Sequence, residues 1–94
     1  MARAGAVAVT LYERPDCHLC EDAVTALAPV VDRLGARLER VNVEADAALE
    51  ARFGAAIPVV VVDGVEVARV PIDLDAVREA IRTAVVRHTT PAAN

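Results

Sequence analysis

Cys17 and Cys20 are the residues whose type and spacing most directly suggest chemistry. They are the two cysteines of a 94-residue sequence, and they stand in the run Cys17-His18-Leu19-Cys20. Residues three apart on a helix lie about 5 to 6 Å apart on one face, within the roughly 4.4 to 6.8 Å that a disulfide requires. A thiol in the first turn of a helix also lies near a partial positive charge that stabilises thiolate. The spacing therefore indicates a dithiol redox centre.

Other interpretations of the cysteine pair stay open at this point. A closed zinc site needs four ligands, and one C-x-x-C pair supplies two of them. A zinc or iron-sulfur site through Cys17 and Cys20 would therefore need a second subunit. The remaining interpretation is an inert pair.

The neighbouring residues predict the elements that position the pair. Residues 6–12 alternate between apolar and polar positions and are rich in valine, which predicts a strand. Apolar residues at helical spacing predict a helix from about Cys17 to Leu34, with Asp16 as its cap. Pro29 lies inside this helix and predicts a kink, and Gly35 ends it. The pair thus lies where a strand passes into a helix.

The rest of the chain carries further strand and helix patterns. Asp63-Gly64 is a two-residue hairpin signal, and Asp73 can cap a final helix. The predicted elements after the first helix are a strand at 37–43, a short helix at 45–53, a strand at 59–62, a strand at 65–70 and a helix beginning near 73. We therefore expect one α/β domain in the order β-α-β-α-β-β-α, with a mixed four-stranded sheet flanked by helices. Its core spans about residues 6–88, and residues 89–94 form a loose tail.

Composition and charge exclude several classes of function. The formal net charge is −4, and Tyr12 and Phe53 are the only aromatic residues, so a nucleic-acid surface is not indicated. No apolar run approaches the roughly 18 residues of a membrane span, and no signal peptide is recognisable. We expect a cytoplasmic monomer. In a reducing compartment, a close cysteine pair is more typical of catalysis, redox sensing or metal binding than of a structural staple.

With the cysteine motif in that position, the chain resembles the glutaredoxin branch of the thioredoxin-like fold. The resemblance rests on the run Arg14-Pro15-Asp16-Cys17-His18-Leu19-Cys20, on Ile57-Pro58 before the valine strand, and on the Asp63-Gly64 hairpin. More narrowly, it is similar to a group of small bacterial glutaredoxin-like proteins. The resemblance implies a redox-active Cys17–Cys20 disulfide, with Cys17 as the nucleophile and Cys20 as the resolving thiol.

The resemblance also implies residues that contact a substrate. Arg14 stands where the family has a basic residue that helps to hold the thiolate and a glutathione carboxylate. The family usually has a glycine pair after the last strand, whereas this chain has Ala68-Arg69-Val70. Arg69 can partly compensate by pairing with a ligand carboxylate. Glutathione is thus expected as a co-substrate that is handled less well than by a typical glutaredoxin, and no cofactor is expected to be tightly bound.

Three further residues are expected at the site. The fold resemblance implies that the Ile57–Pro58 peptide bond is cis and faces the cysteines. The Ile57 backbone could then pair with a substrate strand. His18, next to the nucleophile, either stabilises thiolate when protonated or is a solvated side chain without effect. Both interpretations of His18 stay open.

Together these features predict a glutaredoxin-type thiol-disulfide oxidoreductase that reduces protein, small-molecule or glutathione mixed disulfides. Its electrons would come from glutathione or from a thioredoxin reductase. The alternatives are an iron-sulfur or zinc carrier formed by a dimer, and a redox-dependent partner-binding domain without turnover. Metal content of the purified protein separates the first alternative, and covalent trapping by a Cys20 variant separates the second.

Overall fold

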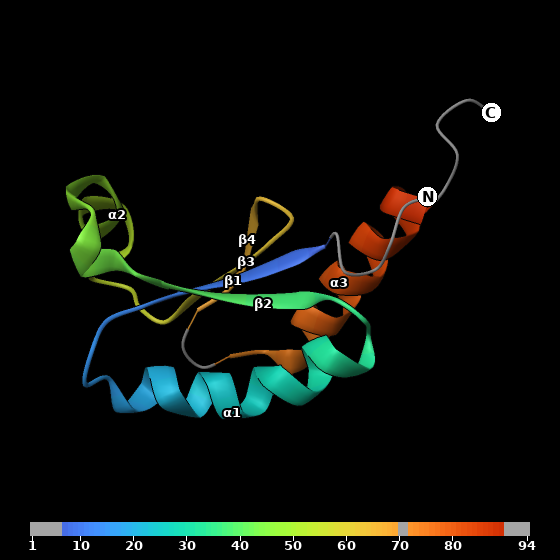
Figure 1. The fold of residues 1–94 in the computed structure, drawn as a ribbon, viewed down its shortest axis with the longest axis horizontal. Helices are drawn as coiled ribbons and strands as arrows, with labels where there is room; N and C mark the ends of the chain where they lie inside the picture. The colour runs from blue at the N-terminus through green and yellow to red at the C-terminus, as the bar shows by residue number, and fades with distance from the viewer. Residues whose placement is uncertain (1–6, 70–71, 90–94) are drawn as a thin grey trace.

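The computed structural model describes residues 7–69 and 72–89. Within these residues the chain follows the predicted order of strand, helix, strand, helix, strand, strand and helix, with one short 3₁₀ turn before the second helix (Figure 1). The predicted α/β architecture, a mixed four-stranded sheet with helices packed against it, is confirmed. Thr89, expected to begin the tail, is the last residue of the final helix. Residues 90–94 and the predicted strand end at residue 70 lie outside the described residues.

The strand β1 (Ala8–Glu13) leads into the helix α1 (His18–Arg33). Cys17 is the N-cap of α1, because its backbone is extended and its sulfur accepts a hydrogen bond from the Cys20 N–H at 3.1 Å. The prediction that Asp16 caps this helix is therefore wrong. Asp16 has φ 59°, a left-handed conformation that aspartate tolerates in turns, so the helix begins one residue later than an Asp16 cap requires.

The end of α1 confirms the role expected of Gly35. Gly35 has φ 73°, a conformation that glycine adopts without the steric cost of a Cβ. Its N–H donates to the Asp32 carbonyl at 3.1 Å, and the Ala36 N–H donates to the Val31 carbonyl at 3.0 Å. These two bonds satisfy carbonyls that the helix end leaves open. The helix continues through Pro29, and the kink expected there stays a prediction.

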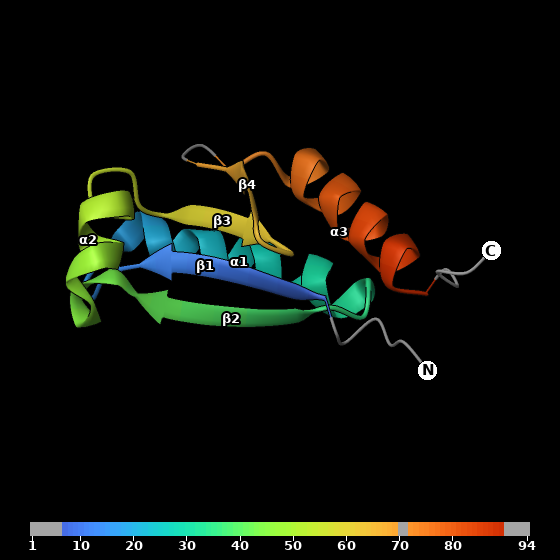
Figure 2. The same cartoon turned by 90° about the horizontal axis from the view of Figure 1, so that it is seen from above.

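The strands are ordered β2-β1-β3-β4, with β2 (Arg37–Asn42), β3 (Val59–Val62) and β4 (Val65–Ala68) placed around β1. β2 runs parallel to β1, whereas β3 is antiparallel to both β1 and β4. Since Tyr12 pairs with Val59, the carboxyl end of β1 and the amino end of β3 lie at the same end of the sheet. The cysteine motif leaves the sheet at this end (Figure 2).

A hairpin turn, a 3₁₀ turn and an aspartate cap form the remaining connections between elements. Asp63 (φ 51°) and Gly64 (φ 86°) form the hairpin between β3 and β4, as their sequence predicts. The 3₁₀ turn η2 (Val43–Ala45) joins β2 to α2 (Ala47–Phe53). Asp73 caps α3 (Leu74–Thr89), because its carboxylate accepts hydrogen bonds from two backbone N–H groups at 3.0 and 3.1 Å.

The alternation along β1 divides the core in two. Val9 and Leu11 belong to a large aliphatic cluster with residues of α1 and α3, which cover one face of the sheet (Figure 1). Tyr12 belongs to a smaller cluster near α2, where its ring stacks on that of Phe53 with 4.2 Å between centroids. Glu13 shares the face of Val9 and Leu11, because side chains two apart on a strand lie on the same side.

Candidate functional site

Cys17 and Cys20 form a disulfide bond at the start of α1, and their Cα atoms are 5.1 Å apart. This separation lies within the range that the helical spacing predicts. Cys17 is the N-cap and Cys20 lies in the first turn, so both sulfur atoms sit at the positive end of the helix dipole. The pair is thus placed where reduction would release thiols that favour their charged form.

The two sulfur-bearing residues differ in their access to solvent. Cys20 has no exposed surface, whereas Cys17 is partly exposed. Cys17 lines an open depression together with the side chains of Asp16, His18 and Glu21. An incoming reactant can therefore reach Cys17 and not Cys20.

The Ile57–Pro58 peptide bond is cis, as the fold resemblance predicted. Pro58 directly precedes Val59, which pairs with Tyr12 near the end of β1. The sheet register therefore brings Ile57 and Pro58 to the end of the sheet from which the cysteine motif emerges. Pro58 is fully buried, and Ile57 is partly exposed.

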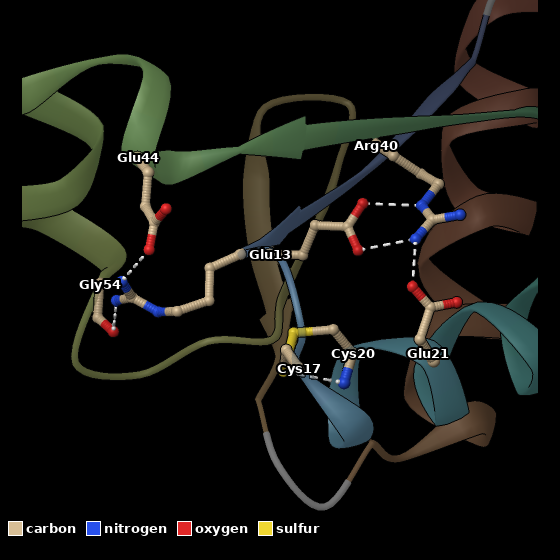
Figure 3. The surroundings of a disulfide bond; sticks show 8 residues. Glu13, Cys17, Cys20, Glu21, Arg40, Glu44 and Gly54 are labelled. Atoms are coloured by element: carbon tan, nitrogen blue, oxygen red, sulfur yellow. Dashed lines mark hydrogen bonds and ion pairs between the residues drawn. A yellow bond between two sulfur atoms is a disulfide. The ribbon is translucent and has the colours of Figure 1, made fainter.

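Arg14 is engaged by carboxylates of the η2–α2 region. Its guanidinium donates to Glu44 and Glu50 at 3.0 Å each, and to the Gly54 carbonyl at 2.6 Å. Hydrogen bonds to Glu50, and then those to Glu44, raise the pKa of Arg14 above its ordinary value. Figure 3 shows Glu44 and Gly54 on α2's side of the disulfide, away from Glu21. In this structure the guanidinium is bound to the protein's own acceptors, and its expected contact with a substrate stays a prediction.

Arg69 has a similar internal partner. Its guanidinium pairs with Glu66 of β4, and a second bond between the two side chains measures 3.2 Å. Hydrogen bonding with Arg69 lowers the pKa of Glu66, and the same contact raises the pKa of Arg69. His18 is exposed beside Cys17 in the depression, so both interpretations of this side chain remain open.

The sequence interpretation missed a cluster formed by Glu13, Arg40 and Glu21. Glu13 is 8% exposed and is the only charged residue among the buried side chains of the described part of the chain. Arg40 donates to its two oxygens at 2.7 and 2.9 Å, and to Glu21 at 2.8 Å (Figure 3). These contacts raise the pKa of Arg40, mainly through Glu13 and then through Glu21. A carboxylate on the buried face of β1 was the signal that could have revealed a cationic partner.

The described part of the chain contains neither a metal-binding cluster of side chains nor a helix that could span a membrane. In residues 7–69 and 72–89, no three His, Cys, Asp or Glu side chains converge as they would to hold a metal ion. Over the same ranges, no helix combines the length and apolar character needed to cross a membrane.

Comparisons with known proteins agree with this geometry. The family model described as "Glutaredoxin-like domain (DUF836)" matches residues 8–82. The crystal structure of protein XcR50 from X. campestris is 41% identical and has a TM-score of 0.64, with 80% of this chain and 96% of that one covered. No curated protein matches the chain significantly.

More distant structures show the fold alone. The solution structure of protein Ne2328 from Nitrosomonas europaea has a TM-score of 0.67 at 22% identity, covering 82% of this chain and 88% of that chain. The thioredoxin of Fasciola hepatica has a TM-score of 0.53 at 21% identity, covering 90% and 83% of the two chains. With the family model spanning β1 to most of α3, this chain belongs to the glutaredoxin-like (DUF836) family and has a thioredoxin-like fold.

Proposed function

We propose that this protein is a thiol-disulfide oxidoreductase in which Cys17 is the nucleophile and Cys20 the resolving thiol. The observation that carries the proposal is the disulfide at the start of α1, with Cys17 partly exposed and Cys20 fully buried. Access decides which sulfur meets a substrate, because thiol-disulfide exchange requires direct attack of one sulfur on another.

The reaction proceeds through two exchanges. The Cys17 thiolate attacks a substrate disulfide, forms a mixed disulfide and releases one substrate thiolate, which takes up a proton. The Cys20 thiolate then attacks Cys17, forms the intramolecular disulfide and releases the second substrate thiol. Two electrons have passed to the substrate. An external dithiol, or two external thiols, returns the protein to its reduced form by the reverse exchange.

Two features of α1 support thiolate at Cys17. The Cys20 N–H already lies 3.1 Å from the Cys17 sulfur, so it can donate to a thiolate there. The N-terminal end of the helix adds a partial positive charge. Asp16 and Glu21 line the same depression and act in the opposite direction, because like charges disfavour a second anion. The balance of these charges sets the reactivity of Cys17.

The substrates we propose are protein or small-molecule disulfides, with glutathione as a poorer co-substrate. Arg14, which the resemblance assigns to a glutathione carboxylate, and Arg69, which was expected to compensate for the missing glycine pair, are each paired with carboxylates of the protein. A glutathione carboxylate must compete with those partners. A thioredoxin-reductase system is therefore the preferred electron source, and the cytoplasm is the proposed setting.

We also propose that an extended segment of the substrate docks against the Ile57 backbone. Ile57 is partly exposed and precedes β3 at the end of the sheet that carries the cysteine motif. Backbone hydrogen bonds of this kind need no particular substrate side chain. Such docking suits a protein that reduces several disulfide substrates.

Cysteine variants test the assignment of roles. In the reduced protein, brief treatment with iodoacetamide near neutral pH should label Cys17 first, as read by mass mapping. Cys17→Ser should abolish turnover of a disulfide substrate, and Cys20→Ser should retain the substrate as a mixed disulfide on Cys17. Preferential labelling of Cys20 would reverse the roles. A Cys20→Ser protein that traps no disulfide substrate would favour a binding domain without turnover.

Turnover with two electron donors tests the choice of substrate. The glutathione arm uses a glutathionylated peptide with glutathione and its reductase. The other arm uses a protein disulfide with thioredoxin reductase. We expect faster turnover in the second arm. Efficient, saturable turnover in the glutathione arm would contradict this proposal and indicate an ordinary glutaredoxin.

A further inference from the structure

Arg40 links β2, on which it lies, to β1 and α1 through side-chain hydrogen bonds. It extends from β2 and donates two hydrogen bonds to Glu13 at the end of β1, at 2.7 and 2.9 Å. Its Nη2 atom also donates to Glu21 of α1 at 2.8 Å. Figure 3 draws these three side chains in the surroundings of the disulfide, with Glu21 on the same turn of α1 as Cys20.

Glu21 connects this cluster to both cysteines. It directly follows Cys20, and its backbone N–H donates to the Cys17 carbonyl at 3.1 Å. Its side chain lines the same open depression as Cys17. A change in the position or charge of the Glu21 carboxylate should therefore change the electrostatic potential at the Cys17 sulfur atom, where the thiolate forms.

Arg40 and Arg14 differ in which carboxylates around the dithiol they bind. Asp16, Glu21 and His18 line the depression with Cys17, and Glu13 accepts hydrogen bonds from Arg40. Arg14 bonds instead to Glu44 and Glu50 of the η2–α2 region. Among the described residues, Arg40 is thus the arginine paired with the carboxylates on the dithiol's side.

We propose that Arg40 is a positioning residue that sets the reduction potential of the Cys17–Cys20 couple by holding and neutralising Glu13 and Glu21. The inference rests on the proposed function and adds the regulation of its site. Reduction of the disulfide takes up two electrons and breaks the S–S bond; Cys20 takes up a proton, and Cys17 takes up a second proton or stays a thiolate according to its pKa. Unneutralised carboxylates disfavour the thiolate of the reduced form, which raises the thiol pKa and favours the disulfide.

Charge variants of the cluster give effects of opposite sign. Arg40→Gln removes the cation and should raise the pKa of the Cys17 thiol. The equilibrium constant for reduction by dithiothreitol should then fall about tenfold, which is roughly 30 mV for a two-electron couple. Glu21→Gln removes an anion and should lower that pKa and raise the constant. Arg40→Lys keeps the charge and should restore most of the wild-type value.

The measurements use the intact protein and need no physiological substrate. The Cys17 pKa comes from the pH dependence of iodoacetamide labelling, and the constant from equilibration with reduced and oxidised dithiothreitol. Arg78→Gln is the matched control, because Arg78 lies on α3 and pairs there with Asp75. Its values should equal those of the wild type.

The outcomes separate a role in the redox couple from a purely structural one. Opposite shifts in Arg40→Gln and Glu21→Gln support the proposal. Unchanged pKa and exchange constants would overturn it, even if the melting temperature of Arg40→Gln falls. Shifts of the same sign would also overturn it. Should Arg40→Gln fail to fold, Glu21→Gln decides the matter, since its side chain is 65% exposed.

Failure of the proposed function would look different. In that case the wild-type disulfide would equilibrate with dithiothreitol but turn over no disulfide substrate. The potential and the thiol pKa are properties of the dithiol itself, so the role of Arg40 is tested independently of turnover.

Discussion

Two arginine clusters lie at the end of the sheet that carries the disulfide, and they differ in what they hold. Arg14 joins two carboxylates that are each more than 40% exposed, Glu44 and Glu50. Arg40 joins Glu13, whose side chain is 11% exposed, to Glu21 beside Cys20. Arg14 is the closer of the two to the cysteines in sequence, yet Arg40 is the one that is bonded to a residue of the dithiol's own helix turn.

The pleat of β1 explains this difference. Leu11 and Glu13 lie on the face covered by α1, whereas Tyr12 lies on the face near α2. Parallel pairing of Leu11 with Arg40 puts Arg40 on the α1 face beside Glu13. Arg14 continues the alternation of Tyr12 and reaches the carboxylates near α2. Strand register therefore decides which arginine bonds to the carboxylates on the α1 face, and distance along the chain does not.

The largest expected difference between the clusters is in stability. Arg40→Gln leaves the buried carboxylate of Glu13 without its charged partner, which should cost about 2 to 3 kcal/mol in the free energy of unfolding. Arg14→Gln should cost less, because the Glu44 and Glu50 side chains are far more exposed than that of Glu13. Urea unfolding of both variants measures the two costs. Equal losses would show that burial of Glu13 does not distinguish the clusters.

Gly54 offers a way to disturb the Arg14 cluster alone. A Cβ built on Gly54 would lie 2.1 Å from a Glu50 carboxylate oxygen and 2.5 Å from the Glu50 carbonyl oxygen. Gly54→Ala should therefore destabilise the protein by about 1 to 2 kcal/mol through overpacking. Thermal or urea unfolding measures the loss, and equilibration with dithiothreitol should give the wild-type constant. A shifted constant would show that the two clusters are coupled.

Release of Arg14 tests its availability for glutathione. The double change Glu44→Gln and Glu50→Gln removes both ionic partners of the guanidinium, so a substrate carboxylate no longer competes with them. The KM for a glutathionylated peptide should fall severalfold. Glu39→Gln, which alters an exposed ion pair with Arg37 on β2, is the matched control. An unchanged KM in the double variant would remove Arg14 from the proposed substrate site.

The exposed Glu66–Arg69 pair should give the smallest effect and supplies a reference for solvated ion pairs. Its Glu66 pKa is lowered from 4.5 by hydrogen bonding with Arg69, so the pair stabilises the fold above the pKa of the unfolded chain. This contribution is lost as pH falls through the lower folded-state pKa. The difference in melting temperature between wild type and Glu66→Gln should thus be small at neutral pH and vanish in acid. A difference that grows on acidification would contradict the sign.

Most of the fold could be predicted because local signals determine it. The dithiol spacing, the glycine that ends α1, the Asp63-Gly64 hairpin and the Asp73 cap each act over a few residues. The N-cap was assigned one residue too early, because Asp16 and Cys17 both have side chains that can accept a backbone N–H. Only the turn geometry, with Asp16 at φ 59°, selects Cys17.

The site was predicted less completely, because its charges are arranged by contacts far apart in the sequence. Glu13 and Arg40 are 27 residues apart and meet only through the β1–β2 register. Arg14 was expected at the thiolate on the strength of its place in the motif, and its partners Glu44 and Glu50 lie 30 and 36 residues away. Sequence spacing identifies the cysteine pair, and the tertiary fold sets the charges around it.

The strand order has a consequence for association of one chain with another. In the described part of the chain β2 and β4 are the outer strands of the sheet, and the edge of an outer strand is where a foreign strand could pair. β2 carries the charged and exposed side chains of Arg37, Glu39 and Arg40, which resist burial against another sheet. β4 has only four residues, and its pairing with β3 is interrupted by a register shift. Each outer strand therefore has a feature that opposes edge-to-edge aggregation. The central strands β1 and β3 position the end of the sheet at which the disulfide lies.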